Sequence, residues 1–124
     1  IGASPDGGAT FFLTRLAGYQ KAMELMLLAD PVDAETMRDL GLVNRVVPDT
    51  DIAREGAAIV GRLPAGPSVA YAETKALANR AWDVQLAAHL DAEAGAFARC
   101  AGTADFAEGV TAFVEKRKPR FRGA

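Results

Sequence analysis

The sequence is poor in the residues that build disulfides, metal sites and nucleophilic catalytic sets. It has one cysteine, Cys100, and one histidine, His89. A single cysteine excludes an internal disulfide and fits a reducing compartment. There is no metal-ligand cluster, no nucleotide-type glycine loop and no Ser-His-Asp set, so these classes of site are not expected. We interpret His89 as a helix-surface residue and Cys100 as a small buried hydrophobic residue.

Long apolar runs and a strong charge of either sign are also missing. The longest apolar stretch, around "MLLA", falls far short of the ~20 residues of a membrane helix. The first residues lack the basic start and apolar centre of a signal peptide. The net charge of −2 gives no global attraction to nucleic acid or to an anionic membrane. We therefore expect a soluble, cytoplasmic protein that binds neither nucleic acid nor membrane.

What is present is the composition of one small globular domain. The chain has 124 residues, of which 50% are hydrophobic and 24% are charged. Apolar spacing and turn residues predict seven helical segments. Asp6, Ser68 and Asp83 stand where side chains could cap three of them, and Thr103 begins the last. The expected segments are 7–17, 19–28, 33–41, 49–63, 68–82, 83–101 and 103–119.

One stretch, "LVNRVV" at residues 42–47, has the β-branched composition of a strand and lies between Gly41 and Pro48. A lone strand cannot satisfy its own backbone groups, so we expect its partner to lie outside this chain. The sequence also begins at Ile1 without an initiator methionine. Both features suggest a chain that is processed, truncated or part of a longer protein.

Three motifs in order resemble a known family: "IGASPDGGATFFLTRLAGYQKAMELMLLAD", "AETMRDLGLVNRVVP" and "TADFAEGVTAFVEKRKPRF". Together they are similar to the C-terminal half of the crotonase superfamily, the enoyl-CoA hydratases and isomerases. The resemblance implies an α/β crotonase-like parent fold (the ClpP/crotonase superhelix), of which this chain is the mostly α-helical C-terminal part. It implies that residues 1–63 belong to the core and residues 64–124 to a helical region for oligomerisation and CoA contact.

The same resemblance implies that much of the active site lies elsewhere. In the family, two backbone N–H groups of the N-terminal half polarise the thioester carbonyl, and hydratases use two glutamates that would precede Ile1. Such donors commonly supply the largest catalytic contribution. This chain alone is therefore expected to be inactive, and family members assemble as trimers or dimers of trimers.

Asp6 is the candidate catalytic residue that the resemblance assigns. Hydratases typically carry glycine there, whereas isomerase-like branches carry an aspartate that moves a proton along the acyl chain. The alternative is an N-cap, because aspartate before two glycines commonly begins a helix. Ala3 and Ser4, just upstream, are candidates for lining the acyl pocket or are ordinary loop residues.

The basic tail is the second candidate site. Five of the seven residues from Lys116 to Arg122 are basic, although the chain is acidic overall. A solvated, frayed terminus is one interpretation, and nucleic-acid binding a weaker one. By resemblance, Phe113 and Lys116 are substrate-binding residues that contact the adenine and a phosphate of coenzyme A. Their spacing of three predicts that they share one helix face. Glu93 matches a family glutamate that we interpret as structural.

The function implied is isomerisation or hydration of an enoyl-CoA through a thioester enolate, with isomerisation slightly favoured by Asp6. No cofactor or metal is expected beyond the coenzyme A of the acyl-CoA thioester substrate, and the partner is further copies of the protein. The alternative is a non-catalytic, truncated or assembly module of a crotonase-like protein.

Overall fold

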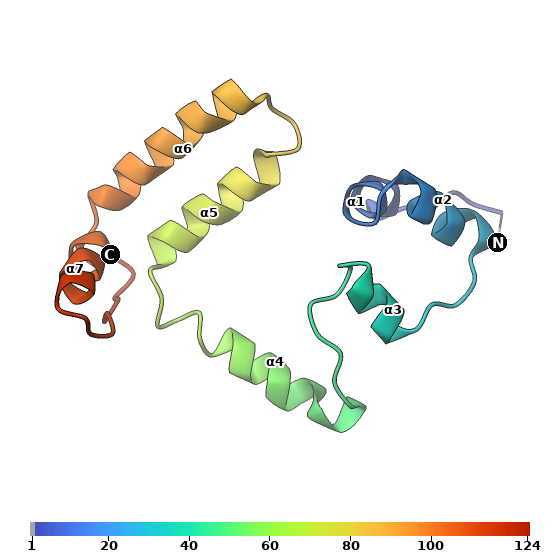
Figure 1. Ribbon diagram of the computed structural model, residues 1–124, viewed down its shortest axis with the longest axis horizontal. Coiled ribbons are helices and arrows are strands. Elements are labelled where there is room, and N and C mark those ends of the chain that lie inside the picture. The colour runs from blue at the N-terminus through green and yellow to red at the C-terminus, as the bar shows by residue number, and fades with distance from the viewer. Residues whose placement is uncertain (1) are drawn as a thin grey trace. The chain divides into compact units, whose positions relative to one another are not determined.

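The computed structural model describes residues 2–124, and its regular structure within that range is helical (Figure 1). The chain divides into two compact units, Ile1–Ile52 and Ala53–Ala124, and each is described by itself. The helix positions agree with the apolar spacing of the sequence, and most observed helices are shorter than expected by one or more residues at their ends.

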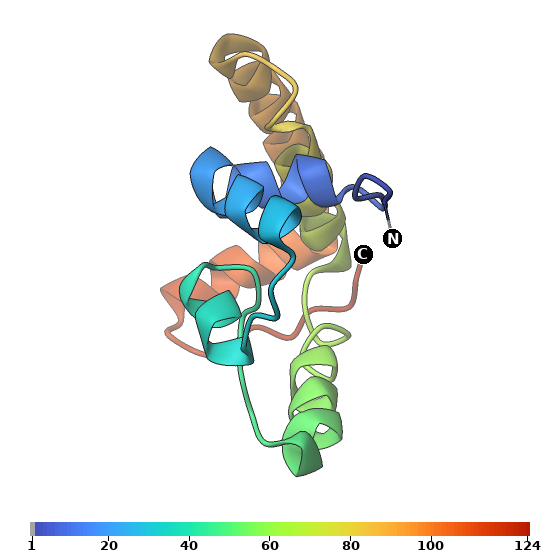
Figure 2. The same ribbon diagram turned by 90° about the vertical axis from the view of Figure 1, so that its right-hand side faces the viewer.

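The first unit is built on a helical pair followed by two short helices. Helix α1 (Ala9–Leu16) packs against α2 (Tyr19–Leu28), as both views of the ribbon show (Figures 1 and 2). Helix α3 (Ala34–Asp39) follows, and η1 (Asp49–Asp51) is a single 3₁₀ turn. Ala22 of α2 is fully buried, because a small side chain allows close approach between helices.

The second unit contains four α-helices: α4 (Ile52–Val60), α5 (Ser68–Arg80), α6 (Leu86–Ala101) and α7 (Ala104–Val114). Helices α5 and α6 form an antiparallel hairpin, and α6 also contacts α7 (Figure 1). The Arg99 guanidinium of α6 donates to both carboxylate oxygens of Glu73 in α5, at 2.6 and 2.7 Å. This bidentate ion pair joins the two arms of the hairpin.

The strand expected at residues 42–47 does not form. These residues take an irregular path between α3 and η1, and residues 2–124 contain no strand that could pair with them. The β-branched composition is that of a strand, but a strand is stable only when a neighbour satisfies its backbone N–H and C=O groups.

The helix caps expected at Ser68 and Asp83 are wrong, whereas Thr103, expected only to begin the last helix, does cap it. The Thr103 hydroxyl accepts the Phe106 N–H at 3.1 Å. Asp83 does not cap, because α6 begins at Leu86 with Gln85 as its N-cap. Ser68 is the first residue of α5, behind Pro67, and its hydroxyl donates to the Gly123 carbonyl at 3.3 Å. A capping side chain acts only from the position directly before the helix.

The buried core within residues 2–124 is small. The fully enclosed apolar residues there are alanines, and large side chains such as Leu27, Leu86 and Phe97 are more than 60% exposed. Exposed apolar area of this extent is typical of surfaces that other chain segments or subunits cover. None of the helices in the described range combines the length and apolar character of a membrane span.

Candidate functional site

The predicted N-terminal site residues lie together in the irregular segment before α1. Ala3, Ser4 and Asp6 are all exposed, and they belong to the first unit. Phe113 and Lys116, the predicted coenzyme A contacts, belong to the second unit. The candidate residues therefore belong to two groups, one in each unit.

Asp6 does not cap α1, contrary to one interpretation of the sequence. The N-cap is Gly8, which has a left-handed backbone (φ 86°), and no side chain caps this helix. Gly7 is also left-handed (φ 60°), so two consecutive left-handed residues stand between Asp6 and the first residue of the helix. Asp6 contributes to the start of α1 only through its backbone, since its carbonyl accepts the Ala9 N–H at 3.0 Å.

The backbone favours glycine at residue 8, because its φ of 86° strains any other residue. A Cβ there would also come within 2.9 Å of the Phe12 ring, which would have to shift. Phe12 in turn packs edge-on against Phe11, with ring centroids 5.2 Å apart. The Arg15 guanidinium lies 3.4 Å from the centroid of the Phe11 ring. Helix α1 therefore carries two aromatic rings in contact, one of them covered by a guanidinium.

The end of α7 differs from its predicted course and changes the geometry of Phe113 and Lys116. The helix ends at Val114, and Glu115 is its C-cap. Lys116 has a left-handed backbone, with φ at 53°. The two residues therefore do not share a helix face as predicted. They are joined by a turn, in which the Lys116 N–H donates to the Phe113 carbonyl at 3.2 Å.

Beyond this turn, residues 117–124 fold back along α7, and we call them the C-terminal strap. Its far end is held by Asp105, which is 4% exposed. The two Asp105 carboxylate oxygens accept the N–H groups of Arg122 and Gly123, at 2.7 and 2.8 Å. The Asp105 N–H donates to the Ala124 carbonyl at 2.9 Å. The terminus is thus an ordered element, not a frayed one.

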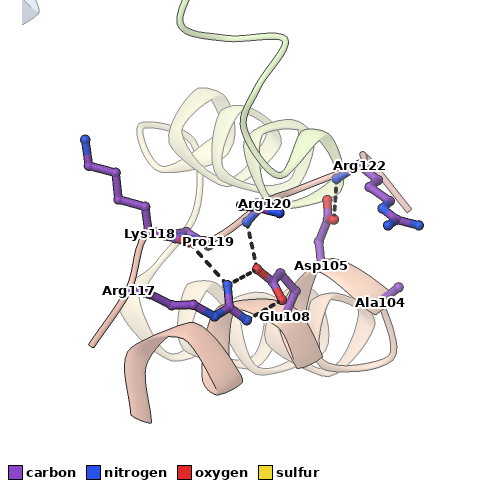
Figure 3. Close-up of a pocket in the computed structure, with 8 residues that line it drawn as sticks. All are labelled: Ala104, Asp105, Glu108, Arg117, Lys118, Pro119, Arg120 and Arg122. Atoms are coloured by element: carbon purple, nitrogen blue, oxygen red, sulfur yellow. Dashed lines mark hydrogen bonds and ion pairs between the residues drawn. The ribbon is translucent and has the colours of Figure 1, made fainter. Parts of the chain in front are cut away.

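The near end of the strap is held by Glu108. Its carboxylate receives two hydrogen bonds from the Arg117 guanidinium, at 2.6 and 2.9 Å, and one from the Arg120 N–H at 2.7 Å (Figure 3). The Arg117 side-chain hydrogen bond, followed by the Arg120 backbone N–H, lowers the pKa of Glu108 to about 2. Glu108 and then Glu115 raise the pKa of Arg117. Glu108 is therefore ionised and fully engaged near neutral pH.

The strap and α7 border a cleft of about 690 Å³ (Figure 3). Its two carboxylates are occupied by the strap, so neither is available as a general acid or base. The side chains of Lys116, Lys118, Arg120 and Arg122 have no carboxylate partner within residues 2–124. Figure 3 shows Lys118 directed away from Glu108. These cations are available to an anionic ligand such as a phosphate.

An apolar groove of about 340 Å³ also lies along α7. Phe106, Val110 and Phe113 of α7 line it together with Phe121 of the strap. Cys100, expected to be buried, is only partly so and also lines this groove. Phe113 is 85% exposed, so nearly the whole ring is accessible for stacking.

His89 and Glu93 form one i, i+4 pair on α6. The His89 Nε2 lies 3.4 Å from a Glu93 carboxylate oxygen, while Nδ1 is buried without a hydrogen-bond partner in the described part of the chain. His89 is thus more enclosed than the surface position that the sequence suggested. No group of three metal-ligating side chains was found among residues 2–124.

Sequence reasoning missed Asp105 and Glu108. A usable signal exists, because two carboxylates three residues apart begin the last helix and five basic residues follow its end. Such a pattern permits the tail to fold back, but only the turn at Lys116 brings the basic tail to the two carboxylates.

The depressed pKa of Glu108 gives a pH-dependent contribution to stability. Its usual value of 4.5 is lowered to about 2 in the folded protein. This contribution is present above about pH 4.5 and is lost as the pH falls toward about 2. Acid lowers the free energy of unfolding, and part of that decrease comes from protonation of Glu108. We expect Glu108→Gln to lack this part, measured by urea unfolding between pH 6 and pH 2. An unchanged pH dependence would contradict the Glu108–Arg117 contact.

Comparison with known proteins places these observations in a family. Residues 1–124 match the family model described as enoyl-CoA hydratase/isomerase. The chain is 39% identical to a protein of Rhodobacter capsulatus named "Probable enoyl-CoA hydratase", over 99% of this chain and 48% of the relative. It is 36% identical to the 1,2-epoxyphenylacetyl-CoA isomerase of Escherichia coli, over 99% of this chain and 47% of that enzyme.

A solved structure agrees with the sequence relatives. The crystal structure of an enoyl-CoA hydratase subunit from Geobacillus kaustophilus matches with a TM-score of 0.95 at 35% identity, over 99% of this chain and 48% of that one. The chain thus spans about half the length of the relatives it matches, and it has the crotonase fold of that half. With a family model matched from end to end, this chain belongs to the enoyl-CoA hydratase/isomerase family, the crotonase superfamily.

Proposed function

We propose that this chain is part of a longer enzyme that hydrates or isomerises enoyl-CoA thioesters through an enolate, without a cofactor beyond the coenzyme A of its substrate. The relatives carry both activities in their names, a hydratase and an isomerase among them. Asp6 favours isomerisation, because a carboxylate close to the acyl chain can move a proton between carbons. The carrying observation is the 85% exposed Phe113 ring three residues before Lys116, whose ammonium has no carboxylate partner within residues 2–124.

Phe113 and Lys116 offer one contact to each part of a nucleotide, the base and the phosphate. A largely exposed aromatic ring offers a stacking face for a base, and the lysine that follows offers a charge-assisted contact to a phosphate. The backbone turn between them, closed by the hydrogen bond from the Lys116 N–H to the Phe113 carbonyl, keeps the two residues close along the chain. In this proposal Ala3 and Ser4 line the acyl pocket, next to Asp6, and the oxyanion donors come from residues outside this chain.

The proposed enzyme is a cytoplasmic homo-oligomer, a trimer or a dimer of trimers. The exposed apolar side chains of α6 and α7, such as Phe97 and Val114, support an interface, since free surfaces rarely carry so many. The same exposure favours the second candidate, a non-catalytic assembly module. Turnover of enoyl-CoA by the purified complete protein distinguishes the two, because a module has none.

The coenzyme A contact is tested by Lys116→Ala in the complete protein. We expect KM for the acyl-CoA to rise several-fold with kcat nearly unchanged, as for a residue that binds ground state and transition state equally. The increase should shrink with an acyl-pantetheine, which has no nucleotide. The measurement is steady-state kinetics with both substrates.

Lys75→Ala is the matched control for this variant. Lys75 is an exposed lysine in α5 of the same unit, and its removal should leave KM unchanged for both substrates. If Lys116→Ala weakens both substrates equally, the tail acts through folding or assembly and not through coenzyme A.

A further inference from the structure

Lys116 occupies a backbone position that normally selects glycine. The Arg117 N–H donates to the Ala112 carbonyl at 3.0 Å, and the Lys116 N–H donates to the Phe113 carbonyl. These two bonds are the Schellman motif, in which the left-handed residue after the C-cap is usually glycine. A lysine here pays a conformational penalty that glycine would not.

The turn is retained because its neighbours hold it from two sides. Arg117, the next residue, is held by the carboxylates of Glu108 and Glu115, the latter at 2.6 Å. Glu108 also accepts the Arg120 N–H, so the chain is fixed on the strap side of the turn as well. Unfavourable backbone conformations persist when the surrounding contacts over-determine them, and they concentrate at functional positions.

We propose that Glu108 is a positioning residue: by clamping Arg117 it holds the left-handed turn that presents Lys116 beside Phe113 for the nucleotide end of the substrate. This inference rests on the proposed role of Lys116. It assigns to Glu108 no contact with the substrate, because its carboxylate is occupied by Arg117 and Arg120. The clamp explains why a lysine is tolerated where glycine is favoured.

The direct test is Glu108→Gln in the complete protein. We expect KM for acyl-CoA to rise several-fold, kcat to stay nearly constant, and KM for acyl-pantetheine to stay unchanged. The control is Glu73→Gln, which breaks the equally bidentate Glu73–Arg99 pair in the same unit. A general loss of stability would affect both variants alike, whereas positioning affects only Glu108→Gln.

The double variant Glu108→Gln/Lys116→Ala tests whether the one residue acts through the other. If it does, the double variant has the same KM as Lys116→Ala alone, because the clamp has nothing left to position. Additive increases in KM would overturn the proposal. Should Glu108→Gln not fold, Arg117→Lys serves the same purpose, because it keeps the charge but cannot bridge both oxygens.

The conformational penalty is tested by replacing the left-handed residues with glycine. Lys116→Gly should raise the Tm while raising KM for acyl-CoA, a trade of binding against stability. Ala29 is the other left-handed non-glycine in the described range (φ 55°), and Ala29→Gly should raise the Tm with no change in KM. A fall in Tm for Lys116→Gly would contradict the conformational argument.

The outcomes separate this inference from the function it rests on. An effect of Lys116→Ala without one of Glu108→Gln overturns the positioning role and leaves the coenzyme A contact standing. No nucleotide-dependent effect of Lys116→Ala overturns both.

Discussion

Replacing Asp6 with asparagine is expected to lower kcat by about 10²–10⁴, the usual contribution of one acid/base group, in the complete enzyme. Asparagine has nearly the shape of aspartate but cannot accept and return a proton near neutral pH. The Asp6 carboxylate makes no hydrogen bond or ion pair within residues 2–124, and the helix cap is Gly8. The stability should therefore stay within about 0.5 kcal/mol of the parent, as for other surface substitutions.

The Asp6 experiment needs enoyl-CoA kinetics and urea unfolding on the same samples. Asp30→Asn is the matched control, because Asp30 is an exposed aspartate of the same unit, just after α2. It should change neither kcat nor stability. Undiminished activity in Asp6→Asn would show that Asp6 does not transfer the proton, and the acid/base role would then belong to groups outside this chain.

Replacing Asp105 with asparagine should give the largest loss of stability, about 2–3 kcal/mol, the contribution expected of hydrogen bonds to a charged acceptor. The 4% exposed carboxylate uses one oxygen for the Arg122 N–H and the other for the Gly123 N–H. An asparagine amide has one oxygen, so its NH₂ group would face a backbone donor without an acceptor between them. The strap should detach at that end.

Urea unfolding and proteolysis of the tail measure this effect. Asp83→Asn is the control, since Asp83 is exposed in the turn between α5 and α6 and caps no helix. Its stability should stay within about 0.5 kcal/mol of the parent. Equal losses in the two variants would mean that the strap contributes nothing specific to folding.

The local elements of this protein could be predicted from its sequence. Apolar spacing and turn residues placed each of the α-helices seen in residues 2–124, and Thr103 was recognised as the start of the last of them, where its hydroxyl accepts the Phe106 N–H only three residues away. The family, too, followed from motifs in order along the chain. Such inferences succeed because helix formation and capping depend on residues close in sequence.

The tertiary structure decided what depends on residues far apart or on the path of the backbone. The strand at residues 42–47 needs a partner, and none exists in the described chain. Gly8 and not Asp6 is the N-cap of α1, so the capping interpretation of Asp6 is wrong, and two left-handed glycines separate Asp6 from the helix. A local sequence pattern does not specify whether a neighbouring strand is present, and it does not specify the direction that the backbone takes at a turn.

The same distinction holds at the candidate site. The basic tail was visible in the sequence, but whether it frays, binds or folds back depends on contacts such as Arg122 with Asp105, seventeen residues apart. The sequence therefore determined the helices, the family and the chemical types of the candidate residues. Only the tertiary structure decided that Lys116 lies in a clamped left-handed turn, because that conformation is imposed by Glu108 and Arg117 across the strap and not by the lysine itself.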